Sequence, residues 1–503
     1  MKHASAGVIA GAAGLGAATY FLGEKTRASQ TATAISTSTS GSTAPYYPPT
    51  VVGPTYTPTR IVKDKIYDIR LNFNVDNPSK SLTDLEVQLI PVEYPHLRKE
   101  AFPEEESRTV HPSFQNLQRE SVVVDFGNLK GGREYQINVL ARDDTGIPDQ
   151  KTLLTAYVRQ FENAGKTDGI LVGAFYYEWY DPDDPWFTRW GWYSPDTWKS
   201  FGYNASPLLG QYSSNDPMVV NKHIDWATGH GVDYFLVHWG SGPGKFDDTV
   251  FKSRILTNPL IAQMKFCILY ESASRLLRAS DGTIPVSDAQ KRSQLLADFD
   301  YLADTYFGHP SYLEIQGKKV VFFDASRSFV GDVEGALMDL RSNLTRKGYD
   351  LYLMCDALGN YLPPIDSKML ALLRSFDAVT ADDMWANNYG DPNAQHDFVA
   401  YTDQALRLWG AYVDKQGKTL IPSINPGWEP YAYYKMQKDF NAPFLKRDPE
   451  RYGKLLSIGL EHSINHIIVG HWNEFFTHSH IEPDTKDGFQ YVQVLREALI
   501  SKE

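Results

Sequence analysis

Short apolar runs alternate with longer segments of helical periodicity from Gly169 to the end of the 503-residue chain. Eight runs have strand character, at 169–180, 233–240, 265–271, 318–325, 349–357, 376–385, 418–428 and 466–475. Segments such as 288–308 and 398–417 lie between them and show helical spacing with charged faces. Eight strand and helix units in one region predict an α/β fold, a (β/α)8 barrel. A doubly wound open sheet is the alternative, but the glycine-rich nucleotide loop expected after its first strand is missing.

Polar and aromatic residues stand where the predicted strands end. They include Glu178, Trp179, His238, Trp239, Glu271, Asp324, Asp356, Asp382, Asp383, Asn425, Trp428, Asn473 and Glu474. Active sites of such barrels lie at the carboxyl ends of the strands. We therefore expect these side chains to surround a substrate cleft, with the tryptophans in the cleft rather than in the core.

Residues 60–163 show a different pattern, typical of strands. In 65–75 the apolar residues alternate with polar ones, and the same period of two returns around Leu85 to Leu89 and Tyr135 to Val139. This predicts a small all-β sandwich before the barrel, and its later strands weakly resemble fibronectin type III domains. The barrel is expected over 164–503.

The first 59 residues carry no core pattern. An apolar run of small residues within 1–25 predicts a signal peptide or a membrane anchor, and 26–59 is a linker rich in Ser, Thr and Pro. We expect an exported protein, secreted or anchored at the cell surface, whose contact with a membrane is limited to the N-terminal segment.

Composition excludes several classes of protein. The net charge of −12 leaves no basic surface for nucleic acid. The two cysteines, Cys267 and Cys355, lie in apolar runs and read as buried thiols, which excludes a disulfide framework. With 11 Trp and 30 Tyr, the chain has many flat apolar side chains of the kind that pack against sugar rings.

Several motifs resemble those of glycoside hydrolase family 99, the endo-α-mannosidases. The matching segments are FYYEWY at 175–180, LGQYSSNDP at 209–217, PSINPGW at 422–428 and the stretch 472–483, which begins WNEFFTHS. His238-Trp239 and Glu271 match two further strand ends of the family. The matches keep their order from about 170 to 483.

The resemblance implies a retaining glycosidase in which two glutamates three residues apart flank the scissile bond. The first, which engages the 2-hydroxyl of the mannoside, aligns with Glu474, whereas the second, the proton donor, falls on Thr477. Threonine is too weak an acid for this role, so a displaced carboxylate is needed. Glu482, Glu271, Glu178, Asp324 and Asp382 are the candidates.

We predict catalytic roles for Glu474, Glu482 and Glu271, and no cofactor. The predicted substrate-binding residues are Tyr177, Glu178, Trp179, Tyr212, His238, Trp239, Asp324, Asp382, Trp428 and Asn473. The run His478-x-His480-x-Glu482 has residue types that suit zinc, but a sugar-contacting or solvated loop is the favoured interpretation, and no metal site is predicted.

Three functions stay open. The first is an endo-acting glycosidase that cleaves α-mannoside or a related α-linked glycan. The second is a carbohydrate-binding pseudoenzyme, favoured by Thr477, and the third is a structural protein of the cell envelope. The expected partner is carbohydrate in the first two.

Overall fold

The computed structural model describes residues 45–166, 169–182, 205–364, 366–384, 388, 391–429, 445–475 and 477–500. The predicted signal or anchor and most of the predicted linker lie outside these residues. Among the residues described, no helix has the length and apolarity needed to cross a membrane.

The N-terminal part of the described chain contains two antiparallel sheets, as the alternating pattern predicts. The first sheet consists of β1 (Thr50–Val62), β2 (Lys65–Asp76) and β5 (Arg119–Phe126). The second has the order β4 (Arg108–Val110), β3 (Leu82–Pro91), β6 (Arg133–Asp143) and β7 (Pro148–Val158). The apolar residues of both sheets form one core, to which β2 contributes Ile69, Leu71, Phe73 and Val75.

Strand β1 corrects one predicted boundary, because it begins at Thr50 within the segment 26–59 assigned to the linker. Val51 is buried in the sandwich core, but Pro54 and Pro58 give the strand the composition of a linker. Strand β1 lies at the edge of its sheet, with only β2 beside it. Proline lacks a backbone N–H, and an edge strand tolerates this because it needs hydrogen bonds on one side only.

Eight parallel strands form the barrel, one from each predicted run, and the predicted fold class is confirmed. They are β8 (Leu171–Tyr176), β9 (Tyr234–Trp239), β10 (Lys265–Glu271), β13 (Lys318–Asp324), β15 (Leu351–Asp356), β16 (Ala378–Thr380), β17 (Thr419–Leu420) and β18 (His466–His471).

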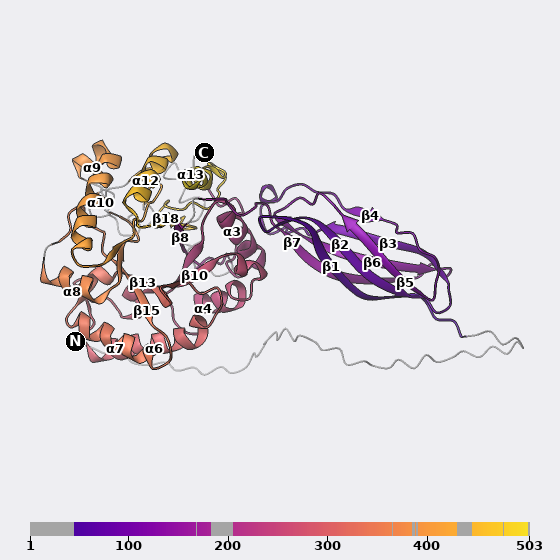
Figure 1. The fold of residues 1–503 in the computed structure, drawn as a ribbon, viewed down its shortest axis with the longest axis horizontal. Coiled ribbons are helices and arrows are strands. Elements are labelled where there is room, and N and C mark those ends of the chain that lie inside the picture. Colours follow the sequence, from indigo (N-terminus) through magenta and orange to yellow (C-terminus); the bar gives the residue numbers. More distant parts are fainter. Residues whose placement is uncertain are drawn as a thin grey trace, which may run out of the picture. The chain divides into compact units, whose positions relative to one another are not determined.

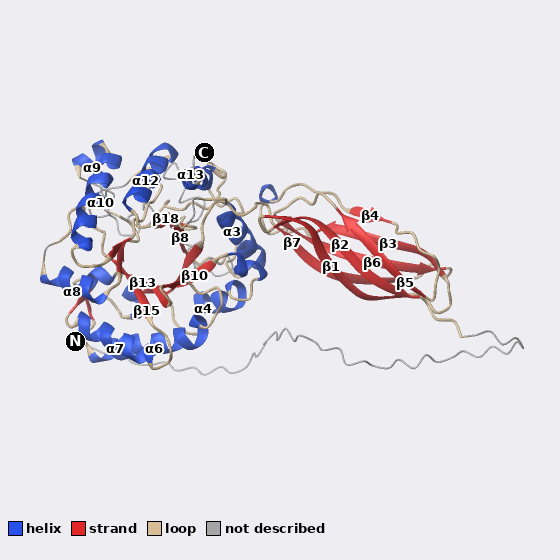
Figure 2. Ribbon diagram, viewed as in Figure 1, coloured by secondary structure: helices blue, strands red, loops and turns tan. Residues whose placement is uncertain are grey.

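The sheet closes on itself. Strand β18 pairs with β8, and the segment after β17 completes the ring because Ile424 N donates to Ile468 O and Ile468 N donates to Pro422 O. Figure 1 shows the strands as a ring with helices around it, and Figure 2 separates the two layers by colour.

Helices follow most of the barrel strands. They are α3 (Pro217–Gly229), α4 (Phe246–Val250), α5 (Ser272–Arg275), α6 (Ala289–Leu302), α7 (Val333–Thr345), α8 (Ser367–Ser375), α9 (Pro392–His396), α10 (Phe398–Asp414), α12 (Pro449–His462) and α13 (Gln490–Leu499). Aspartate side chains cap many of their N-termini, as Asp216 does for α3 and Asp448 for α12.

Short elements complete the described chain. They are the strands β11 (Ile284–Pro285), β12 (Glu314–Ile315) and β14 (Phe329–Val330), the 3-10 turns Lys99–Ala101, Pro259–Gln263 and Ser326–Ser328, and the π turns Phe251–Ile255 and Ala303–Phe307. Cys267 and Cys355 are buried free thiols, as predicted.

Candidate active site

Carboxylates gather at the carboxyl ends of the barrel strands, and two histidines join them into two groups. We call Glu178, His238, Asp247 and Glu271 the His238 cluster, and Asp382, Asp383, His471 and Glu474 the His471 cluster. Each cluster draws on several strands, because parallel strands deliver their last residues to one end of the barrel.

In the His471 cluster, the buried imidazole of β18 bridges carboxylates from two loops. His471 Nε2 lies 2.9 Å from Asp382 Oδ1, and its Nδ1 lies 3.4 Å from Glu474 Oε2. Burial lowers the pKa of His471, but the charges of Glu474 and Asp382 outweigh it and raise the pKa to about 10. His471 therefore carries a positive charge between two carboxylates at neutral pH.

The neighbouring aspartates of this cluster have opposite pKa shifts. Burial raises the pKa of Asp382, but His471 outweighs it through its charge and hydrogen bond, so the net shift is downward. The pKa of Asp383 is raised well above its usual value by burial and by the charges of Asp382 and Glu474. Both side chains are half-buried, so two carboxyl groups with opposite pKa shifts stand side by side with partial access to solvent.

Glu474 is held in place by the residue that replaces the second signature glutamate. Thr477 Oγ1 donates a hydrogen bond of 2.9 Å to Glu474 Oε2, and Ser479 Oγ lies 3.3 Å from the same oxygen. Glu474 is 8% exposed. Thr477 thus orients Glu474 instead of supplying a proton.

Two predicted aromatic residues lie beside this cluster. The rings of Tyr177 and Trp179 are stacked, with centroids 4.1 Å apart and planes 12° apart, and Tyr177 donates to Asp382 Oδ1 over 3.3 Å. Trp179 is half-buried. Tyr177 is 4% exposed and lies against Trp179, so the accessible apolar face next to the carboxylates belongs to Trp179. Such a face can stack on a sugar ring.

Asp324 is a further half-buried carboxyl group, at the end of β13 and in register with Glu271 of β10. Burial and the charges of Asp356, Asp382 and Glu271 raise its pKa well above the usual value. Asp356 itself is fully buried and ion-paired with Arg327, so it faces no substrate.

The His238 cluster is more enclosed. His238 lies 3.3 Å from Glu178 Oε1 through Nδ1 and 2.8 Å from Glu271 Oε2 through Nε2. Glu178 has no exposed surface, and its burial raises its pKa to about 7. Burial lowers the pKa of His238, but its hydrogen bonds to the two glutamates outweigh this and raise it to about 10. Glu271 is the most exposed carboxylate of this group, with a quarter of its side chain accessible.

Three predicted site residues make structural contacts. Glu482 is 1% exposed, accepts a hydrogen bond from Tyr212 and lies 3.2 Å from His223 Nε2, so these contacts give it a structural part and its predicted catalytic role stays a prediction. Tyr212 is buried with it, and its predicted substrate-binding role stays a prediction. The side-chain amide of Asn473 forms two hydrogen bonds with the backbone of Tyr177. Its Nδ2 donates to Tyr177 O, and its Oδ1 accepts from Tyr177 N.

The physical reason is that the chain folds back after β18, because the backbone amides of Ile481 and Glu482 donate to Trp472 O. This turn directs Glu482 into the protein and not into the cleft. The run from His478 to Glu482 does not bring its side chains together as metal ligands. His480 pairs with Asp484, and Glu482 pairs with His223.

Trp239 was predicted to line the cleft, and this is wrong. It has no exposed surface, its Nε1 donates to Asp248 over 3.1 Å, and Arg275 lies 4.9 Å from its ring. Trp428 is half-buried, and the residues that follow it, 430–444, lie outside the described chain. Glu178 is also too enclosed to contact a substrate.

Sequence reasoning missed His471, Asp247 and the role of Asp383. His471 sits inside a run recognised only as a strand, although its place at the strand end was a usable signal. Asp247 comes from α4, nine residues after His238, and no motif marks it.

Taken together, the described strands and side chains define a (β/α)8-type barrel with clusters of carboxylates and histidines at the carboxyl ends of its strands. A solved structure described as a glycoside hydrolase-like protein is similar with a TM-score of 0.50 and 16% identity, over 67% of this chain and 96% of its own. Residues 199–495, more than half of the chain, match the family model described as "Glycosyltransferase WbsX", and the chain belongs to this family.

Two structures of a family 99 endo-α-mannosidase from Bacteroides thetaiotaomicron are also similar. One, in complex with bis-tris-propane, has a TM-score of 0.49 and 20% identity over 66% of this chain and 96% of its own. The other has a TM-score of 0.48 and 18% identity over 67% and 100%. They belong to the family that the sequence motifs resemble. No curated protein matched the chain.

Proposed function

We propose that the chain is an endo-acting glycoside hydrolase for an α-linked glycan, with α-mannosides as the first substrate class. The observation that carries this proposal is the His471 cluster, in which adjacent half-buried carboxyl groups have opposite pKa shifts. Such a pair provides an acid and a carboxylate at the same pH, which glycoside hydrolysis requires.

In this proposal, Glu474 engages the sugar next to the scissile bond, as the family 99 resemblance implies. Asp383, whose pKa is raised by burial and by the charges of Asp382 and Glu474, donates a proton to the leaving oxygen and so replaces the function lost at Thr477. Asp382 stays ionised and stabilises positive charge on the sugar. Trp179 stacks on a ring of the glycan, and the buried ring of Tyr177 supports it from behind.

Glycosyl transfer is the second candidate, favoured by the name of the family to which residues 199–495 belong. The same carboxyl groups would then act while a sugar hydroxyl, instead of water, attacks the anomeric carbon. A barrel that binds glycans without cleaving them is the third candidate, since the signature proton donor is missing.

The test is product release by the full chain from a panel of α-mannans and α-glucans, with and without an acceptor oligosaccharide. Glu474→Gln and Asp383→Asn are the variants, and Asp300→Asn, on the outer helix α6, is the control. Hydrolysis that both variants lose and the control keeps supports the hydrolase. Products longer than the donor indicate transfer, and binding without any product overturns the enzyme proposal.

We also propose that residues 1–25 direct export and that the barrel acts outside the cell, secreted or held at the surface. The apolar run and the linker composition support this. A fusion of residues 1–59 to a reporter that is active only after export tests it.

A further inference from the structure

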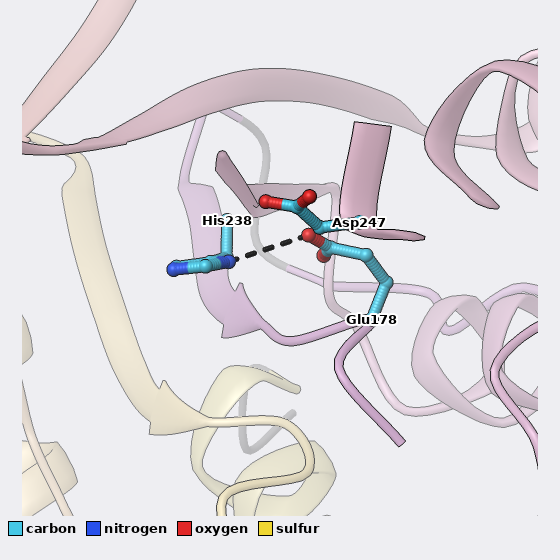
Figure 3. Close-up of side chains that lie close together, drawn as sticks. All are labelled: Glu178, His238 and Asp247. Atoms are coloured by element: carbon cyan, nitrogen blue, oxygen red, sulfur yellow. Dashed lines mark hydrogen bonds and ion pairs between the residues drawn. The ribbon is translucent and has the colours of Figure 1, made fainter. Parts of the chain in front are cut away.

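The His238 cluster brings three potential metal ligands together in the protein interior. Glu178 follows β8, His238 belongs to β9 and Asp247 to α4, and their ligand atoms all lie within 4.8 Å of one another. Figure 3 shows the three side chains pointing toward one another, with the contact between His238 and Glu178 marked. All three residues are buried.

Two carboxylate oxygens of this cluster are buried without a hydrogen-bond partner among the described residues. They are Glu178 Oε2 and Asp247 Oδ1. The other oxygen of Asp247 accepts from Gly240 N at 3.0 Å and Ser241 N at 2.8 Å, which fixes the carboxylate. Buried polar atoms are nearly always paired, so two orphaned oxygens in one cluster point to a ligand.

The imidazole of His238 is oriented as in many metal sites. Its Nε2 contacts Glu271 Oε2 at 2.8 Å, while its Nδ1 faces Glu178 Oε1 at the longer distance of 3.3 Å. A metal-bound histidine characteristically donates its second ring N–H to a carboxylate, which sets the tautomer. Glu271 occupies that position.

The local backbone leaves room for this arrangement only because residue 240 is glycine. A Cβ on Gly240 would lie 2.6 Å from His238 Nε2 and 2.8 Å from Glu271 Oε2. Any side chain there would push the histidine away from its carboxylate.

We propose that Glu178, His238 and Asp247 bind one divalent transition-metal ion, zinc or manganese, and that Glu271 positions His238 for it. One imidazole and two carboxylates form a mixed nitrogen and oxygen set that suits these ions. Because the ligands are buried, the ion is structural: it ties α4 to β8 and β9 behind the cleft. This departs from the sequence analysis, which predicted no metal site.

The experiment strips the full chain with a chelator, adds zinc or manganese, desalts the protein and measures bound metal per chain together with the unfolding temperature. We expect one equivalent and a higher unfolding temperature for the wild type. Glu178→Gln and Asp247→Asn each lose that equivalent. Glu271→Gln weakens the affinity about 10- to 100-fold, as expected for a carboxylate behind a ligating histidine.

Glu482→Gln is the matched control, because Glu482 is an equally buried carboxylate beside a histidine but lies outside the cluster. It keeps the metal. Wild-type protein that retains no ion and shows no shift in unfolding temperature overturns the proposal, since protons alone would then satisfy the cluster.

Metal that persists in the double variant Glu178→Gln/Asp247→Asn also overturns it, and points to Asp382, Asp383 and His471 instead. If the variants do not fold, anomalous scattering from metal-loaded wild-type crystals decides. A peak between the three ligands supports the site, and a peak elsewhere excludes it.

Discussion

The His238 and His471 clusters have the same chemistry but different access to solvent. In each, a buried histidine lies between carboxylates that raise its pKa to about 10. Glu178 of the first cluster is fully enclosed, whereas Asp382 and Asp383 of the second are half-buried. A strongly shifted pKa therefore does not by itself locate an active site.

The largest expected effect separates the clusters by activity. Glu474→Gln should lower the hydrolytic rate about 10²- to 10⁴-fold, the usual contribution of acid and base groups. Glu178→Gln, assayed well below its own unfolding temperature, should keep most of the activity. Initial rates on the best substrate of the panel measure both, and equal losses in two folded variants would contradict the distinction.

The second expected effect is on stability, and here the His238 cluster should be the more sensitive of the two. In metal-free protein, His238→Ala should lower the free energy of unfolding by about 3–5 kcal/mol, because it leaves the enclosed Glu178 without a counter-charge. His471→Ala should cost less, since water reaches Asp382 and Asp383. Urea-induced unfolding of both variants provides the measurement, and the reverse order would show that exposure is not the deciding factor.

The third prediction concerns pH and the share of the His471 cluster, because the pKa of His238 is also raised to about 10 and contributes to the same decline. The pKa of His471 is about 10 in the folded protein, above its ordinary value of 6.5, so the folded state holds the proton more tightly. Its contribution to stability is fully present below about pH 6.5 and is lost as the pH rises towards 10. His471→Gln should flatten the decline of stability in this window.

His466→Gln is the control on the same strand. The pKa of His466 is lowered to about 3 by burial, so it is neutral across the same window and its loss should leave the slope unchanged. The slope that remains in His471→Gln is expected from His238, whose pKa is also raised to about 10. A slope that is as steep as that of the wild type would assign the whole titration to other groups.

The smallest expected effect tests the packing of the His238 cluster. Gly240→Ala should cost about 1–3 kcal/mol of stability, because the added methyl group meets His238 and Glu271 at under 3 Å. Gly410→Ala is the control, since its Cβ would meet Leu420 at an ordinary 3.7 Å inside α10 and should stabilise by up to about 1 kcal/mol. Thermal unfolding separates the two, and equal effects would remove the packing argument.

The barrel could be predicted from sequence because each strand is a distinct apolar run, and the carboxyl-end carboxylates follow from those runs. The direction of individual side chains could not. His238 and Trp239 are neighbours on β9, so they point to opposite faces, one into the cluster and the other towards Arg275 and Tyr301 in the helical layer. The sequence shows that both end a strand but not which one faces the cleft.

The positions of side chains outside the barrel strands could not be predicted from the sequence for a related reason. Whether Glu482 reaches the cleft depends on backbone bonds to Trp472, and the place of Asp247 depends on the turn that contains Gly240. Neither arrangement has a period or a motif. In the sandwich, Pro54 and Pro58 hid β1 because an edge strand tolerates residues that a central strand excludes.

The pairing of the first and last barrel strands affects how the chain folds while it is being synthesised. Strand β8 pairs with β18, and almost 300 residues separate the two. At the usual 5–20 residues per second, the ribosome needs on the order of 15–60 s to make that stretch. Throughout this time the apolar sequence LVGAFY of β8 has one edge without its final partner. We therefore expect a nascent chain that stops before residue 466 to depend on chaperones, and the finished chain to lose this dependence as soon as β18 emerges.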